Sequence, residues 1–340
     1  MKMLFAVCAA FASVACLAAG GAAMPHSGMR YATDAYPGFD SEDNIVNSGK
    51  KTPRWFAWLN GPSRTNAVEQ LAYAAECETN KSWRAARKAY DALVREWPSA
   101  PEAPLAQEAL ARMLLEERAD LEGAFYEYRY LLDYYPSACD FDAIAAKLYE
   151  IAGRMREAGK DFLYLFHFAN TVEVRRAYEA VVLRAPGASY APDAMLAVAA
   201  LREDAGENDK AVMVYETLRS LYSSSEEAMR ALRLEGAARM KLLRMHSYNA
   251  PRCRDTIEYL RLALASAQTS EARADLERWL AEADGIADDE AYASARFYDS
   301  KTRTRQSAVS AYERYLSDRP AGRHAAEARA RVAELKGGVR

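Results

Sequence analysis

A four-point column of side chains recurs along this chain and ends each time at a proline or a serine. Successive members of the column are four, three and four residues apart, which places them on one face of an α-helix. A proline cannot continue a helix, so we expect each helix to end there. The pattern predicts the second helix of a helical-hairpin repeat. The copies are Ala86, Tyr90, Leu93 and Trp97 before Pro98; Ala124, Tyr128, Leu131 and Tyr135 before Pro136; Val174, Tyr178, Val181 and Ala185 before Pro186; Ala211, Tyr215, Leu218 and Tyr222 before Ser223; and Ala308, Tyr312, Tyr315 and Arg319 before Pro320.

A second pattern follows in the same register. Small residues five and eight positions after most column ends would let the next helix lie close: Ala103 and Ala106, Ala191 and Ala194, Ala228 and Ala231, Ala325 and Ala328. After Pro136 these positions hold Phe141 and Ile144 instead. The column tyrosines are 38, 50, 37 and 97 residues apart, so a degenerate copy is expected in the last interval, at Thr256, Leu260, Ala263 and Ala267. The sequence predicts an all-α, tetratricopeptide-like helical-hairpin solenoid of about five to six units, coiled as a right-handed superhelix.

This array is expected to have two parts. Residues 67–285 form the repeats, and residues 286–340 form a C-terminal hairpin with a capping helix. Near the boundary we expect two separate helices, at residues 271–283 and 288–300.

The first 23 residues have the features of a secretory signal peptide. Lys2 provides a charged start, residues 4–19 are apolar, and residues 18–23 are all alanine or glycine. The apolar stretch is shorter and richer in alanine than a good membrane span of about 20 residues. We therefore expect an exported protein.

Two kinds of processing fit this segment. The sequence from Ser13 to Cys16 resembles a lipobox, in which the cysteine receives a lipid and becomes the first residue. Such a lipid would be the chain's only contact with a membrane. The alternative is ordinary cleavage after Ala23.

Residues 24–66 are rich in proline and glycine and are expected to form an extended, irregular tether. Within it, Trp55 and Trp58 belong to a dense apolar cluster that must be buried somewhere. This cluster either docks on the first helix pair or binds a partner.

The charge of the chain is nearly balanced but unevenly distributed. The formal net charge is −3, which argues against a nucleic-acid partner. Residues 296–340 carry 11 Lys or Arg against 5 Asp or Glu, a net charge of +6. Arg303 and Arg305 in this basic segment are candidate partner-binding residues; the alternative is a solvated helix surface.

The sequence contains no pattern that indicates catalysis, a metal site or a cofactor. The four histidines are isolated, and no two cysteines have the spacing of a zinc or thiol-redox motif. We therefore expect no enzyme. The 21 tyrosines favour binding or packing instead. Tyr126 and Tyr130 lie off the repeated column and are candidate binding anchors, or else core residues of the helix seams.

Three stretches carry a family resemblance. Residues 82–110, SWRAARKAYDALVREWPSAPEAPLAQEAL, residues 186–222, PGASYAPDAMLAVAALREDAGENDKAVMVYETLRSLY, and residues 288–320, DDEAYASARFYDSKTRTRQSAVSAYERYLSDRP, resemble the first, a central and the last repeat of the BamD family. This is the family of tetratricopeptide lipoproteins in the outer-membrane β-barrel assembly machinery.

The resemblance implies a scaffold without a cofactor at the periplasmic face of the bacterial outer membrane. Its partners would be the barrel insertase, other assembly lipoproteins and unfolded outer-membrane protein segments. Residues 67–185 would meet these client segments, and residues 224–335 would meet the insertase. The alternative is a periplasmic cell-envelope and division coordinator of the Tol-Pal type. Such proteins usually carry an N-terminal coiled coil, and residues 24–66 contain no heptad run.

Overall fold

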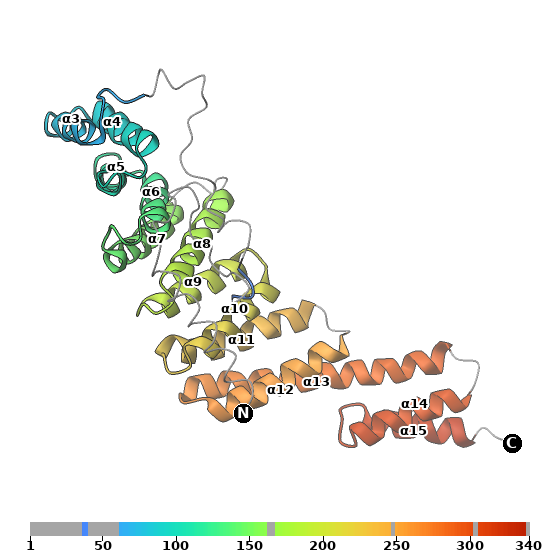
Figure 1. Cartoon of the computed structure of the whole chain (residues 1–340). Helices are drawn as coiled ribbons and strands as arrows, with labels where there is room; N and C mark the ends of the chain where they lie inside the picture. Colours follow the sequence, from blue (N-terminus) through green and yellow to red (C-terminus); the bar gives the residue numbers. More distant parts are fainter. Residues whose placement is uncertain (1–35, 40–60, 162–166, 246–248, 302–304, 338–340) are drawn as a thin grey trace. The chain divides into compact units, whose positions relative to one another are not determined.

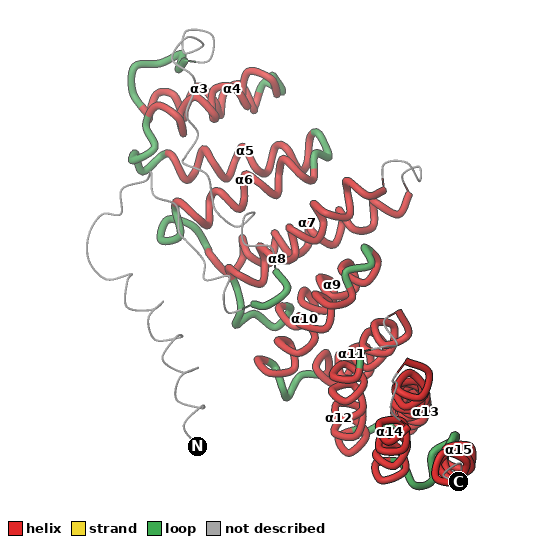
Figure 2. Tube along the Cα trace, turned by 90° about the vertical axis from the view of Figure 1, so that its right-hand side faces the viewer, coloured by secondary structure: helices red, strands yellow, loops and turns green. Residues whose placement is uncertain are grey.

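The computed structural model describes residues 36–39, 61–161, 167–245, 249–301 and 305–337. Within these ranges the chain forms α-helices joined by turns, and no strand (Figures 1 and 2). The predicted all-α class is therefore confirmed. Among the described residues, no helix combines the length and the hydropathy that a membrane span requires. The helices belong to two compact units.

The first unit is a stack of helical hairpins. Its helices are α3 (Ala67–Thr79), α4 (Trp83–Glu96), α5 (Ala103–Glu117), α6 (Leu121–Tyr134) and α7 (Phe141–Asp161), and each packs against the next. Side-chain caps fix three of the helix starts, those of α3, α6 and α7. Asn66 accepts a hydrogen bond from the backbone N–H of Glu69, and Asp120 accepts one from that of Gly123.

The second unit continues the same hairpin pattern. Its helices are α8 (His167–Arg184), α9 (Ala191–Asp204), α10 (Asn208–Leu221), α11 (Glu226–Met245), α12 (Ala250–Ser266), α13 (Ser270–Lys301), α14 (Arg305–Asp318) and α15 (Ala325–Gly337). Each helix packs against the next, and α11 also touches α9 and α13. The helical-hairpin solenoid is thus present in both units.

The repeated columns are the buried faces of the second helices. Tyr215 is 1 % exposed, and the other column tyrosines, Tyr90, Tyr128, Tyr178 and Tyr312, are also buried. The alanine pairs of the second pattern are all buried, as close helix packing requires. Thr256, Leu260 and Ala263 of the degenerate copy are buried on α12, which confirms that copy.

A polar tie accompanies several of the column tyrosines. The hydroxyl of Tyr215 donates a 2.8 Å hydrogen bond to Glu203 at the end of α9, and Lys241 on α11 pairs with the same carboxylate. Each tie joins the two helices of one hairpin to the first helix of the next. It occurs twice more, in the sets Tyr90, Glu78 and Arg112, and Tyr312, Asp299 and Arg331.

One helix differs from the prediction. The break expected between residues 271–283 and 288–300 is absent, because α13 continues for 32 residues. Relative to alanine, Gly285 destabilises the helix by only about 1 kcal/mol. The first half of α13 buries Trp279 in a core with α11 and α12, and the second half buries Tyr292 in a core with α14 and α15. This burial outweighs the glycine, and the expected domain boundary at residue 285 lies inside the helix.

Of the predicted tether, residues 24–66, the structure describes residues 36–39 and 61–66. Residues 36–39 form a tight turn that lies on α10 in the second unit. Trp55 and Trp58 lie outside the described residues, so docking of their cluster stays a prediction.

Candidate binding groove

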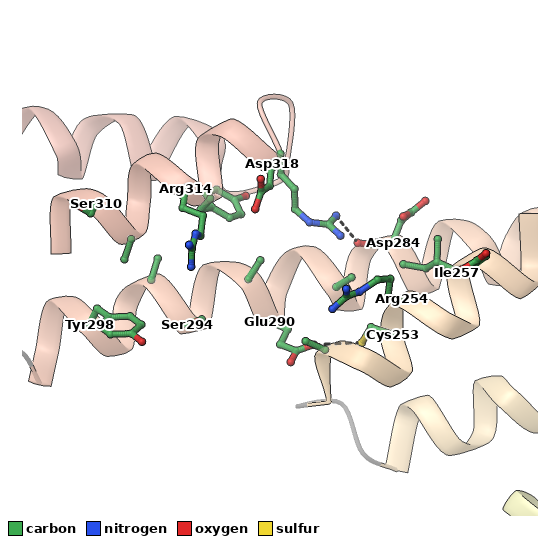
Figure 3. A pocket seen from close by; sticks show the side chains of 18 of the residues that line it. Cys253, Arg254, Ile257, Asp284, Glu290, Ser294, Tyr298, Ser310, Arg314 and Asp318 are labelled. Carbon is green, nitrogen blue, oxygen red and sulfur yellow. Dashed lines mark hydrogen bonds between the residues drawn. The ribbon is translucent and has the colours of Figure 1, made fainter. Parts of the chain in front are cut away.

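A groove of about 1320 Å³ lies over the middle of α13, between α12 and α14 (Figure 3). Each of the three helices lines it with residues at the four-three-four spacing of one helix face. These are Ala250, Arg254, Ile257 and Arg261 on α12; Ala287, Ala291, Ser294 and Tyr298 on α13; and Ser307, Ala311, Arg314 and Asp318 on α14. A trough walled by three helix faces can receive a fourth helix.

The length of α13 explains why the groove is open. At 1.5 Å per residue, α13 is about 48 Å long, and neither α12 nor α14 covers all of it. α12 packs on the first half of α13, and α14 packs on the second half. Between them, Ala287, Ala291 and Ser294 are too short to fill the space. The fusion of two expected helices into one therefore creates the groove.

The groove presents exposed apolar side chains. Leu262 on α12 is 65 % exposed, and Tyr298 on α13 is 46 % exposed. Ile257 adds a buried apolar wall. Tyrosine and arginine side chains are frequent anchors of protein interfaces, so Tyr298 is the main candidate anchor here.

The walls carry both signs of charge: Arg254, Arg261, Arg314 and Arg319, with Glu258, Asp284, Glu290 and Asp318. Arg261 lies 3.7 Å from the Asp284 carboxylate, and Arg319 donates to the Asp284 carbonyl oxygen at 3.2 Å. Within the described part of the chain, Arg254 and Arg314 form no ion pair. Both side chains extend from opposite walls toward α13 (Figure 3). These two guanidinium groups are available to a partner.

Cys253 is a packing residue of the α12 wall. Its thiol donates to the Glu290 carboxylate over 3.3 Å. Burial, and then the contact with Glu290, raise the pKa of the thiol to about 11. The thiol is therefore protonated at neutral pH and is a poor nucleophile.

A polar cluster near the groove is structural. Asp288 is buried and accepts hydrogen bonds from the Tyr315 hydroxyl at 3.0 Å and from the Arg323 backbone N–H at 2.7 Å. His324 Nε2 lies 2.8 Å from the exposed Asp289 carboxylate. Since both oxygens of Asp288 are engaged, this group fixes the turn between α14 and α15 against α13.

The basic candidate residues are only partly described. Arg305 is the first residue of α14; it is exposed and does not line the groove. Arg303 and the lipidation candidate Cys16 lie outside the described residues.

The two candidate tyrosines differ from each other. Both lie on α6 in the first unit. Tyr126 is 40 % exposed, with the Arg129 guanidinium 4.8 Å from its ring centroid. Tyr130 is half-buried and stacks on Tyr134 at 4.2 Å between centroids. Tyr126 is thus partly exposed beside Arg129, whereas Tyr130 is largely a packing residue.

Reasoning from the sequence missed the groove because it placed a helix break at residues 284–287. A usable signal was present. Ala287, Ala291, Ser294 and Tyr298 repeat the four-three-four spacing from the edge of that break through the next segment. A face of small residues ending in an exposed tyrosine could have been recognised as a second, unfilled column.

Comparisons with known proteins give the following. No family model matches the chain, and no curated protein matches it. Among solved structures, a tetratricopeptide repeat protein from Parabacteroides merdae is similar, with 12 % identity and a TM-score of 0.28 over 79 % of this chain and 98 % of that one. Nothing in these comparisons is specific to the BamD family. The assignment to helical-hairpin repeats rests on the chain's own helices, and proteins of this architecture use extended surfaces to bind other proteins.

Proposed function

We propose that this protein is a non-enzymatic scaffold of the outer-membrane β-barrel assembly machinery and that its groove binds a helix of the barrel insertase. The observation that carries the proposal is the open trough on α12, α13 and α14. It lies in residues 224–335, the segment that the BamD resemblance assigns to the insertase. The signal-like N-terminus adds support, because such a partner is met only after export.

The chemistry of the trough defines the helix that it fits. Leu262 and Tyr298 favour an apolar stripe, and the small side chains along α13 allow a close approach. Arg254 and Arg314 favour carboxylates on both flanks of that stripe. The expected occupant is therefore an amphipathic helix with acidic residues beside its apolar face.

The other surfaces receive their roles from the same proposal. The first unit, with Tyr126, would hold unfolded outer-membrane protein segments, and Arg303 and Arg305 would contribute to insertase or lipoprotein contacts. A lipid on Cys16 would hold the chain at the periplasmic face of the outer membrane; without it, the chain would be soluble in the periplasm.

Pull-down from solubilised outer membrane tests the groove. Arg254→Glu combined with Arg314→Glu should reduce co-purified insertase at least tenfold. The matched control is Arg87→Glu combined with Arg230→Glu, which reverses two exposed arginines outside the groove. Equal recovery with both double variants would refute the groove assignment.

Depletion of the protein tests the wider role. We expect folded outer-membrane barrels to decrease. Normal barrel levels together with a septation defect would favour the envelope-coordinator alternative.

A further inference from the structure

Residues 36–39, with the sequence Tyr-Pro-Gly-Phe, form a tight turn. The N–H of Phe39 donates to the carbonyl oxygen of Tyr36 at 3.1 Å. Gly38 has a φ of 91°, the left-handed conformation that the third position of a type II turn requires, and Pro37 occupies the second position. The rings of Tyr36 and Phe39 stack with centroids 5.3 Å apart. The turn therefore has a defined shape with two aromatic rings.

The turn lies directly on α10. A Cβ atom at Gly38 would come within 2.7 Å of the Lys210 carbonyl oxygen and 2.9 Å of Val214 Cγ2. The backbone of the turn thus touches the backbone of the helix, and only glycine fits at this point. Both the space and the positive φ exclude a side chain here.

The aromatic part of the turn is buried as well. Tyr36 is 8 % exposed, and burial raises the pKa of its phenol. The pKa of Tyr222, at the end of α10, is raised by burial and by its proximity to Tyr36. The docked turn therefore combines a buried ring, that of Tyr36, with a glycine that lies against Lys210 and Val214.

We propose that this surface of α10 is a peptide-binding site for a turn of the sequence aromatic-Pro-Gly-aromatic, which the chain's own residues 36–39 occupy as an intramolecular ligand. A partner protein that displays such a turn would bind here when residues 36–39 leave. The site is independent of the groove on α13 and of the role proposed for it.

The covalent connection makes the built-in turn a strong competitor. A ligand that belongs to the same chain docks intramolecularly, so a free peptide has to compete with it for the site. A free peptide of the same sequence should therefore bind poorly to the intact chain and well to a chain whose own turn is excluded.

The test uses the full chain and a fluorescein-labelled peptide with the sequence of residues 32–43. Gly38→Ala should expel the built-in turn, because the added methyl group meets the Lys210 carbonyl oxygen. The matched control is Gly187→Ala, since a Cβ atom there meets nothing within 4 Å. By fluorescence anisotropy, the peptide should bind the Gly38→Ala chain at least tenfold more tightly than it binds the unaltered chain or the control. A peptide with alanine in place of Gly38 should not bind.

Two results would overturn the proposal. One is equal binding of the peptide to all three chains, and the other is binding to none of them while circular dichroism shows that all are folded. If Gly38→Ala prevents folding, the double variant Tyr36→Ala and Phe39→Ala replaces it, with the same expected tenfold gain. Amide hydrogen exchange gives a second readout: exchange in residues 210–214 should accelerate in the variant and slow again when peptide is added. Unchanged exchange would likewise refute the site.

Discussion

The hydroxyl of Tyr222 donates a 2.6 Å hydrogen bond to the carbonyl oxygen of Pro186, 36 residues earlier. Tyr222 is the last member of its column, and Pro186 is the residue that follows the preceding column. In the first unit, Tyr135 makes the equivalent bond to the carbonyl oxygen of Pro98 at 2.9 Å. The end of one second helix is thus fastened to the end of the one before it. This accounts for the tyrosine at the last position of these two columns; the other three columns have Trp97, Ala185 and Arg319 there.

Removing this bond should weaken the stack slightly. Tyr222→Phe keeps the ring and leaves the Pro186 carbonyl without its donor, so we expect a loss of about 1 kcal/mol in the free energy of unfolding. Urea denaturation of the full chain measures this loss. An unchanged midpoint would mean that water replaces the hydroxyl without penalty.

Removing a column ring should have a much larger effect. Tyr215 is 1 % exposed, so Tyr215→Ala should reduce stability by roughly 3–5 kcal/mol through lost burial and the cavity that remains. Tyr215→Phe loses only the bond to Glu203 and should cost about 1 kcal/mol. Thermal unfolding of the two variants separates packing from hydrogen bonding. Similar losses in both would refute the structural role of the ring.

The continuity of α13 is testable with a proline. Ile286→Pro should destabilise the chain by about 3 kcal/mol or more if residue 286 lies inside a helix. Ile286→Ala is the control for lost side-chain packing. If proline and alanine have equal effects on the melting temperature, the helix is interrupted at this point after all.

The sequence predicted the hairpins well because their signals are local. In four copies a column of four residues and a proline define where the second helix lies and ends, and in the copy that ends at Ser223, Tyr215 and Leu218 are buried as the spacing requires. The groove depends on a different kind of information. Gly285 and Asp284 resemble a turn locally, yet Trp279 and Tyr292 on either side are buried against different helices, and α13 continues between them. That tertiary burial cannot be seen in a short window of sequence.

Residues 36–39 illustrate the same limit. Pro37 and Gly38 indicate a turn, which the sequence shows. The position of the turn on α10 depends on contacts with Lys210 and Val214, which are far from it along the chain.

The carboxylate of Asp299 should make the stability of the fold depend on pH. The hydrogen bond from Arg331, followed by smaller contributions that include Tyr312, holds the pKa of Asp299 below its ordinary 3.8. A carboxylate with a lowered folded-state pKa stabilises the fold fully above its unfolded pKa, and this contribution disappears as the pH falls through the lowered value. Asp299→Asn should therefore cost about 1 kcal/mol at pH 7 and progressively less below pH 4.

The melting temperatures of the unaltered protein and of Asp299→Asn, compared between pH 7 and pH 2.5, measure this loss of stability. Glu313→Gln is the control, because it removes the exposed pair with Lys336 on the same end of the array and should have a smaller effect. A difference between wild type and Asp299→Asn that does not change with pH would contradict the assignment.

Site-specific photocrosslinking in cells tests most directly whether the groove on α13 binds the insertase. A photoreactive residue at Ser294, on the groove floor, should crosslink to the barrel insertase, identified by mass spectrometry of the adduct. The same residue at the exposed Glu277, on α13 outside the groove, should give no such adduct. An insertase adduct at Ser294 alone is the result we predict. Adducts from Ser294 only to division proteins, or equal insertase adducts from both positions, would contradict the account.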